Sequence, residues 1–281
     1  MSGDGYFYPD VGDKMTGETV ERFGRTRWAL EEAYVLNEFR KIIGSSDLTV
    51  DAGTGMGRLI PYLRSFSRKV IAIDRDPMRL SVAMKNFDFE DVFFAQGRIG
   101  DLSFIPPRIA GVVNCSHVFQ HIPHYEVLHG LAEFQRVLKV GGFLILLTTH
   151  SPEGDKYYLV EQEGSVEVSK EEFEKAAENP VEGVLPVRKF SVEGIVKLLK
   201  DFGFELVKKY YYHIMPGQYP GEFLEVLEKL PGNSVTPHEF HKLVEEPIVK
   251  EFTEHFERIN GDEESARKNS IDIAFLFRRR E

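Results

Sequence analysis

From residue 47 onward, short runs of apolar, often β-branched residues alternate with longer amphipathic stretches. Such runs are typical of the strands of a parallel sheet, and the stretches between them are typical of crossover helices. The alternation therefore predicts an α/β fold, with a mostly parallel, doubly wound sheet and helices on both faces. The expected strands are 48–51, 69–74, 92–95, 109–115 and 142–149, and the expected helices are 57–66, 77–86 and 125–138.

The pattern becomes irregular after residue 150. Residues 151–190 are rich in Glu and interrupted by Pro, which predicts a partly helical insertion. Ser191 is expected to cap a helix that ends at Gly203. We predict a single domain with the following parts: a helical N-terminal lid (1–46), a cofactor-binding core (47–150), an insertion (151–190), more core (191–213), a helical insertion (214–269) and the last strand (270–281).

Composition and charge exclude several classes of protein. The chain of 281 residues has 45 acidic and 35 basic side chains, a formal net charge of −10. This acidity disfavours a general nucleic-acid binder without excluding one, because phosphate contacts need basic side chains. Cys115 is the only cysteine, which excludes an intramolecular disulfide framework and favours a reducing, cytoplasmic location. No apolar run reaches the length of a membrane span, so no membrane association is expected.

The most informative local segment is Asp51-Ala-Gly-Thr-Gly-Met-Gly-Arg58, which lies between an expected strand and an expected helix. Glycines at alternate positions let the backbone turn with positive φ and let a ligand approach closely. A nucleotide-type site at the carboxyl end of the first strand follows. Arg58 stands where a dinucleotide fingerprint requires its third glycine, and the Gly-Lys-Ser/Thr of a P-loop is missing.

This D-x-G-x-G-x-G segment resembles motif I of class I S-adenosylmethionine-dependent methyltransferases. Three further segments resemble later sequence motifs of the same family, and they occur in the same order. They are 70–77 with Asp74 at the end of the second strand, 96–104 with Asp101, and 112–123 together with 134–144. The acidic Asp51 suits a ligand that carries an ammonium group and would repel a pyrophosphate.

The resemblance implies a seven-stranded sheet in which a final antiparallel strand, residues 270–278, lies beside the fifth. It also implies S-adenosyl-L-methionine as cofactor, with Asp74 accepting the ribose hydroxyls and Asp101 accepting the adenine amino group. Leu102 is expected to pack on the adenine ring, and Cys115 to be a small buried residue near it. The complete set of expected cofactor contacts is Asp51, Gly53, Thr54, Gly55, Gly57, Asp74, Arg75, Asp101, Leu102 and Cys115.

Candidates for contacts with the methyl acceptor are His121, His117 and Tyr6. Histidine titrates near neutral pH and can accept a proton from a nucleophile. His117, His121 and His124 also have helical spacing, but no carboxylate at matching spacing completes a metal site, so no metal is expected. The aromatic segment that contains Tyr6 suits either a lid over the cofactor or the core around a leading helix.

Together these features predict methyl transfer to a nitrogen or oxygen nucleophile, most simply on a small-molecule acceptor. The alternatives are a protein or tRNA acceptor, or a non-catalytic protein that binds S-adenosylmethionine and regulates a partner. A nicotinamide-dependent oxidoreductase is disfavoured by Asp51 and Arg58. We expect the two insertions and residues 1–30 to form a cap over the acceptor, the alternative being a dimer interface or extra packing. The sequence specifies neither the acceptor nor the oligomeric state.

Overall fold

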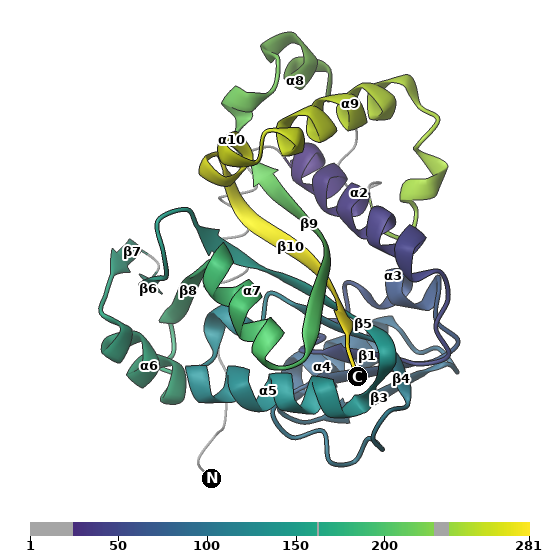
Figure 1. Ribbon diagram of the computed structural model, residues 1–281, viewed down its shortest axis with the longest axis vertical. Coiled ribbons are helices and arrows are strands. Elements are labelled where there is room, and N and C mark those ends of the chain that lie inside the picture. Colours follow the sequence, from purple (N-terminus) through teal and green to yellow (C-terminus); the bar gives the residue numbers. More distant parts are fainter. Residues whose placement is uncertain (1–24, 162, 228–235) are drawn as a thin grey trace.

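Seven strands form the central sheet in the order β3-β2-β1-β4-β5-β10-β9 (Figure 1). The computed structural model describes residues 25–161, 163–227 and 236–281. The five parallel strands are β1 (Thr49–Ala52), β2 (Val70–Asp74), β3 (Val92–Gln96), β4 (Ala110–Ser116) and β5 (Leu138–Ser151). The predicted α/β class and the parallel core are therefore confirmed, with strand limits that agree within a few residues.

The last two strands of this sheet are β9 (Phe204–Ile214) and β10 (Ser270–Arg279). β10 is antiparallel both to β5, where Ala274 pairs with Leu147, and to β9, where Ala274 pairs with Tyr210. The predicted position of the final strand beside the fifth is thus confirmed. Since β10 runs against its neighbours, its first residues lie at the same edge as the carboxyl ends of β5 and β9.

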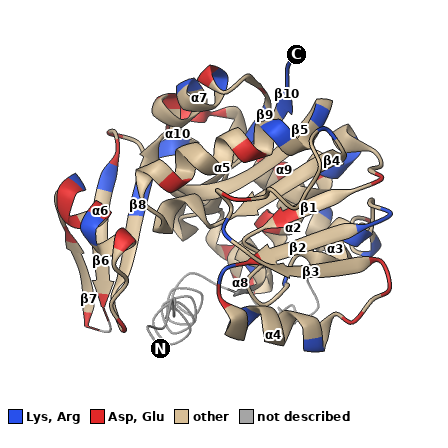
Figure 2. Cartoon of the chain, turned by 90° about the horizontal axis from the view of Figure 1, so that it is seen from below, with Lys and Arg blue, Asp and Glu red and all other residues tan. Residues whose placement is uncertain are grey.

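Helices cover both faces of the sheet, with α5 on one side and α4 on the other (Figure 2). Asp76 caps α4 by accepting hydrogen bonds from the amides of Met78 and Arg79, and Ser191 caps α7 by accepting from Gly194. The helices of the described chain are α2 (Arg25–Ile43), α3 (Ile60–Arg64), α4 (Pro77–Asn86), α5 (His124–Val137), α6 (Lys170–Glu178), α7 (Val192–Asp201), α8 (Gly221–Leu227), α9 (Pro247–Gly261) and α10 (Glu263–Lys268). None of these helices has the length and apolar character needed to cross a membrane.

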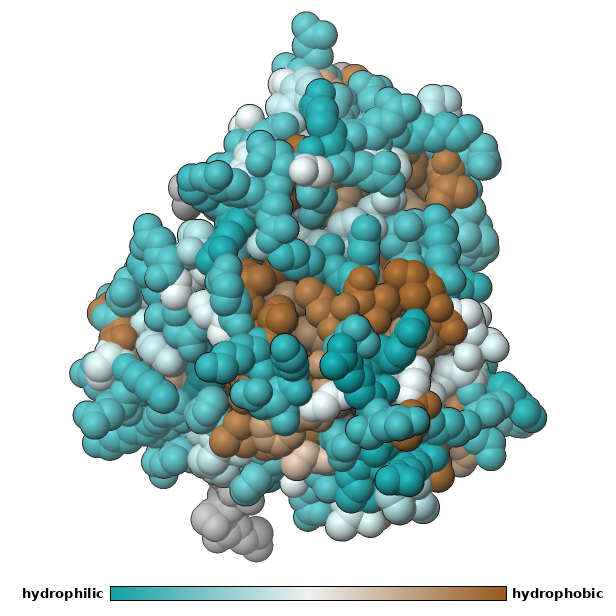
Figure 3. Space-filling model, in the orientation of Figure 1, coloured by the Kyte–Doolittle hydropathy of each residue, from teal (hydrophilic) through white to brown (hydrophobic). Residues whose placement is uncertain are grey.

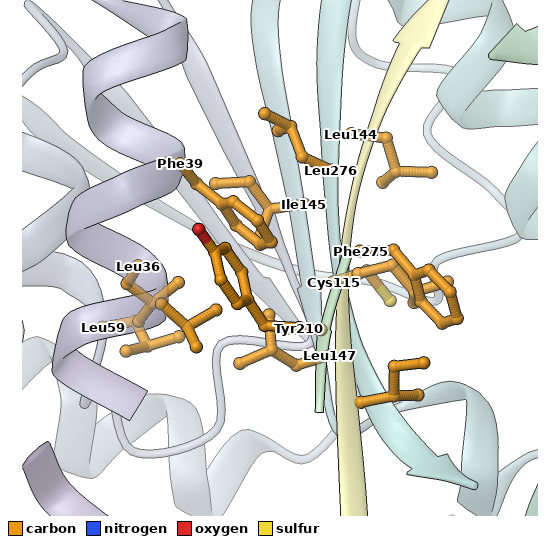
Figure 4. Close-up of a cluster of buried hydrophobic side chains, with 14 of the residues drawn as sticks. Leu36, Phe39, Leu59, Cys115, Leu144, Ile145, Leu147, Tyr210, Phe275 and Leu276 are labelled. Carbon is orange, nitrogen blue, oxygen red and sulfur yellow. The ribbon is translucent and has the colours of Figure 1, made fainter. Parts of the chain in front are cut away.

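The hydrophobic core is continuous around β4, β5, β9 and β10. In Figure 4, Leu36 and Phe39 of α2 lie with Tyr210 on one side of these strands, and Phe275 and Leu144 lie on the other. Phe39 and Phe275 are completely buried. Helix α2, which precedes the first strand in the sequence, is therefore an integral part of the core through its contacts with β9.

The first insertion is partly helical, as predicted, through α6, but it also contains strands that were not predicted. β6 (Lys156–Glu161) and β7 (Gly164–Glu167) form a hairpin. β6 also pairs with β8 (Leu185–Ser191), and β8 joins the end of β5 in parallel at His150 and Ser151. This pairing extends the seven-stranded sheet to ten strands. The sequence pattern missed it because the strands are short and their hairpin is exposed, so they lack a continuous apolar run.

The second insertion is helical, as predicted, and its apolar stripe packs against α2 and β9. Phe252 and Phe256 of α9 are completely buried, and Tyr34 of α2 makes edge contacts with both rings. The Tyr34 hydroxyl donates to Glu257 on the same helix. In α8, Phe223 and Leu227 are buried, whereas Val226 is 51% exposed. This insertion is thus anchored on the core through α2.

A buried histidine joins the ends of β5 and β10. His150 Nε2 lies 2.7 Å from the Ser270 hydroxyl, and burial lowers the pKa of this imidazole to about 4. In the unfolded chain the pKa is near 6.5. The unfolded state therefore binds a proton between about pH 6.5 and pH 4 that the folded state does not bind.

We accordingly expect this site to lower the free energy of unfolding as the pH falls from 7 to 5, by about 2 kcal/mol. Denaturant titrations at pH 7, 6 and 5 measure the change. His150→Gln should flatten the pH dependence, whereas His129→Gln, which replaces an exposed histidine on α5, should leave it as in the parent protein. Equal slopes in the parent and His150→Gln would contradict the assignment.

Candidate functional site

A buried carboxylate organises the end of the first strand. Asp51 accepts hydrogen bonds from the Thr54 hydroxyl and from the Asn114 side-chain amide, each at 2.7 Å. Asn114 in turn accepts from the Ser116 hydroxyl at 2.9 Å. Burial raises the pKa of Asp51 although both hydrogen bonds oppose this shift. The network ties the ends of β1 and β4 together, and sequence reasoning missed the part of Asn114 in it.

The loop from Gly53 to Gly57 adopts the positive φ angles that were expected from its glycines. All three glycines have positive φ: +88° at Gly53, +56° at Gly55 and +85° at Gly57. A methyl group on Gly53 would collide with the side chain of Val118, which follows β4. The loop therefore lies directly against the segment that carries His117.

Asp74 lies at the end of β2 and is bonded to this loop. One carboxylate oxygen accepts from the Gly55 amide at 2.7 Å, and the other accepts from the Asp76 amide at 2.9 Å. Burial raises the pKa of Asp74 in spite of these two bonds. An ionised carboxylate can accept about four hydrogen bonds, so each oxygen retains acceptor capacity for a ligand.

The segment after β3 is arranged differently from the expectation. Asp101 lies in a turn five residues beyond the end of β3, is exposed, and accepts from the Ser103 amide at 3.2 Å. Leu102 is completely buried, and its amide donates to Glu133 at 2.7 Å. The structure therefore places Leu102 in the core and does not present it to a ligand.

Two arginines that follow β2 and β3 meet a buried acid instead. Arg75 Nη1 lies 3.7 Å and Arg98 Nη1 lies 3.6 Å from the same oxygen of Glu126 on α5. Arg75 was expected at the site, whereas Arg98 and Glu126 were missed. Arg98 follows the end of β3 by two residues, and this position could have indicated that its side chain lies at the carboxyl edge of the sheet.

Cys115 does not reach the site. Its side chain has no exposed surface and lies beside Phe275 in the core (Figure 4). Burial raises the pKa of the thiol well above its ordinary value. Because side chains alternate along β4, Asn114 points to Asp51 and Cys115 points to the opposite face. Cys115 is therefore a small buried residue, as expected, and its side chain points away from the Asp51 network.

The two candidate histidines lie at the carboxyl end of β4. His117 has a φ of +56°, and its Nε2 lies 2.8 Å from the Tyr212 hydroxyl. His121 donates from Nδ1 to the carbonyl of Pro186 at 2.9 Å, which puts its proton on Nδ1. Burial lowers the pKa of both, that of His121 to about 4, so both are neutral at pH 7. Tyr6, the third candidate, lies outside the described residues.

Further polar groups at this edge come from segments that sequence reasoning did not connect. His213 and Asp272, at the adjoining ends of β9 and β10, are 2.5 Å apart from Nδ1 to Oδ2. Trp28 of α2 stacks on the His213 ring, with a centroid distance of 4.0 Å. Arg58, at the end of the glycine loop, forms a two-bond ion pair with Glu32 of α2.

These groups offer acids, neutral bases and glycine amides at one edge of the sheet. That combination suits binding of a ligand with an amine and hydroxyls beside a site for proton transfer. Among the described residues, no three His, Cys, Asp or Glu side chains are grouped so that they could hold a metal ion.

Comparison with known proteins supports this picture. Residues 50–146 match a protein family described as a methyltransferase domain. The match includes the Asp51 network, the glycine loop, Asp74 and the histidines after β4. No curated protein matches the sequence.

Several solved structures share the fold at low sequence identity. The 1,6-didemethyltoxoflavin-N1-methyltransferase of Burkholderia thailandensis, with 1,6-didemethyltoxoflavin and S-adenosylhomocysteine bound, is 12% identical, with a TM-score of 0.56 over 96% of this chain and 84% of that one. The N-methyltransferase NodS of Bradyrhizobium japonicum, with S-adenosylhomocysteine, is 10% identical, with a TM-score of 0.53 over 89% and 87%.

A third similar structure belongs to the protein that forms a complex with the Haloferax volcanii Trm112 methyltransferase activator. It is 16% identical, with a TM-score of 0.57, and both chains are covered over 100% of their length. The sheet order, the glycine loop and the family match agree with one another. The chain therefore contains, in residues 50–146, a class I S-adenosylmethionine-dependent methyltransferase domain.

Proposed function

We propose that this methyltransferase acts on a nitrogen or oxygen nucleophile of a small-molecule acceptor. The observation that carries the proposal is that segments outside the parallel core contact residues at the carboxyl edge of the sheet. β8 of the first insertion contacts His121 through the Pro186 carbonyl, and α2 stacks Trp28 on His213. An edge flanked by such segments favours a small molecule over a folded macromolecule.

The surface charge supports the same conclusion. In Figure 2, Lys and Arg are interspersed with Asp and Glu along the described chain. The face in Figure 3 is mostly hydrophilic, with an apolar band around β9. A tRNA acceptor needs a basic surface to compensate its phosphates, so it is the less favoured alternative.

The residues around the glycine loop fit the cofactor. The spare acceptor capacity of Asp74 suits two ribose hydroxyls, and Gly53 lies too close to Val118 to carry a side chain. We propose that residues 53–57 hold the methionyl part, that Asp51 acts through Thr54, and that Arg75 borders the ribose. When bound, S-adenosylmethionine supplies an electrophilic methyl group.

For the adenine we propose Asp101 together with Arg98, without Leu102. The Asp101 carbonyl lies next to Gly97, and the Gly97 amide donates to the Asp74 carbonyl at 3.0 Å. This places the Asp101 turn beside the end of β2. Arg98 approaches the same region from β3 and is half exposed, so its guanidinium is accessible to a ligand.

We further propose that both insertions and α2 cap the acceptor. The first insertion is held by Arg188, which is 2% exposed, donates to Glu174 at 2.7 Å and contacts His124 at the start of α5. The second insertion contributes Tyr219, whose hydroxyl donates to Glu31 of α2 at 2.9 Å. These contacts fix both insertions to the segments that border the site.

Replacement of Asp74 tests the cofactor assignment. Asp74→Ala removes charge-assisted hydrogen bonds, so we expect the Kd for S-adenosylmethionine to rise roughly 10- to 100-fold, about 1.4–2.8 kcal/mol. Asp76→Ala is a matched control, because it removes the cap of α4 and should cost stability without a comparable loss of affinity. Calorimetry on both variants measures the difference, and an unchanged Kd in Asp74→Ala would refute the ribose assignment.

A methyl-transfer assay tests the acceptor class. The protein with radiolabelled S-adenosylmethionine is offered small amines and hydroxyl compounds, bulk tRNA, and protein from a cell extract. We expect label in the small-molecule fraction. Label only in tRNA or protein would overturn the small-molecule proposal, and binding without any transfer would favour the regulatory alternative.

The cap is tested by loosening the first insertion. Arg188→Met breaks a buried ion pair, and we expect the free energy of unfolding to fall by about 3 kcal/mol. We also expect a higher KM for the acceptor with an unchanged Kd for S-adenosylmethionine. Lys189→Met is the matched control, since its ammonium lies over the Tyr158 ring at the hairpin, 5.1 Å from the ring centroid. An acceptor KM equal to that of the parent would contradict the cap.

A further inference from the structure

Two histidines at the acceptor side of the site have positive backbone φ angles, which residues other than glycine rarely adopt. Among the described residues, Arg108, His117 and His213 are the non-glycine residues with positive φ, at 58°, 56° and 53°. Such conformations cost free energy and persist where the surrounding structure enforces them. Both histidines follow or end strands at the carboxyl edge, where this strain points to a role in the site.

A chain of contacts leads from the glycine loop to His213. Val118 packs against Gly53, and its neighbour His117 shares a hydrogen bond of 2.8 Å with the Tyr212 hydroxyl. The Tyr212 and His213 rings are 4.4 Å apart between centroids. His213 therefore lies on the side of the loop where β4 ends.

His213 is oriented by Asp272. The Nδ1–Oδ2 distance is 2.5 Å, and Asp272 is 5% exposed. Burial opposes ionisation, but the His213 hydrogen bond and the fields of His213, His117 and His150 outweigh it and hold the pKa of Asp272 below its usual value. An ionised Asp272 accepts the Nδ1 proton, which leaves the Nε2 lone pair of a neutral His213 as the proton acceptor.

The imidazole of His213 packs against Trp28 and remains partly exposed. Trp28 stacks on it at an interplanar angle of 19°, and 14% of the His213 side chain remains exposed. The second oxygen of Asp272, Oδ1, is buried without a hydrogen-bond partner. The other charged or titratable groups near the pair are Glu31, Glu32, Arg58, His117, His150 and Tyr212.

We propose that His213 is the general base of methyl transfer and that Asp272 is its positioning residue. This inference rests on the proposed function. The N–H or O–H bond of the acceptor breaks and its proton passes to His213 Nε2. The freed electron pair forms the bond to the methyl carbon, and the carbon–sulfur bond breaks with its electrons retained by sulfur. The imidazolium then returns its proton to solvent.

The proposal narrows the acceptor class. A base is useful for a nucleophile that must lose a proton, such as a hydroxyl group, an ammonium ion or an amide-type N–H. Thioethers have no such proton. We therefore assign to this site an acceptor with a dissociable N–H or O–H group.

The first test needs no acceptor. Long-range ¹H–¹⁵N spectra of the full chain with S-adenosylhomocysteine report the tautomer of each histidine. We expect the neutral form of His213 to carry its proton on Nδ1, and we expect Asp272→Asn to change this pattern. A neutral ring that carries its proton on Nε2 in the parent protein would overturn the proposal, whatever the acceptor.

The second test uses the acceptors that the panel identifies. His213→Asn keeps a residue that tolerates positive φ, and we expect kcat to fall roughly 100- to 10,000-fold with little change in acceptor KM. Calorimetry should show an unchanged Kd for S-adenosylmethionine, and added imidazole should restore part of the rate. His255→Asn, which removes another histidine near a carboxylate, Glu251 on α9, is the control and should retain the parental kcat.

The outcomes separate this inference from the proposed function. Parental kcat in His213→Asn, or transfer only to thioethers, overturns the base while methyl transfer itself stands. If the parent transfers no methyl group to any fraction, the proposed function fails, and with it the assignment of His213 as a base. The tautomer spectrum then still reports whether the pair exists.

Discussion

The antiparallel pairing of β10 between β5 and β9 is the constraint on which the site depends. Asp272 lies opposite Thr149 on one side and Tyr212 on the other. Because β10 enters the sheet at the edge where the parallel strands end, its first residues meet the ends of β4, β5 and β9. A shift of one residue in this register would turn Asp272 to the other face and separate it from His213.

Burial then shifts the pKa values of the polar groups at this edge. It lowers the pKa of His117 and His121, raises that of Asp51 and Asp74, and is outweighed at Asp272 by the neighbouring histidines. The same edge thus holds neutral bases next to an ionised acid. Such an arrangement is stable only because each group has a specific partner, as a buried polar group without one is costly. The insertions supply some of these partners, such as the Pro186 carbonyl for His121.

Much of the fold was predictable because its signals are local. Apolar runs and capping residues mark the ends of elements, so the parallel strands and the helix that begins after Asp76 agree with their predictions. The hairpin of the first insertion was missed because short exposed strands have no distinctive pattern. At the site, the glycine loop and Asp74 were found from a motif that lies within one strand–loop–helix unit. The burial of Cys115 agrees with its prediction, whereas the direction of its side chain was missed because it depends on the alternation of side chains along β4.

The sequence by itself determined the α/β class, the glycine loop with Asp51 and Asp74, and with these the kind of cofactor. Each follows from residues a few positions apart, whose geometry is set by backbone sterics and hydrogen bonds along the chain. Only the tertiary structure decided that His213 and Asp272, which are 59 positions apart, form a pair, and that Trp28 stacks on it. It also decided that Arg98 and Arg75 converge on Glu126 while Leu102 turns into the core. Contacts of this kind depend on strand register and helix packing, which arise from the free energy of burying the whole core and leave no signature in any short segment.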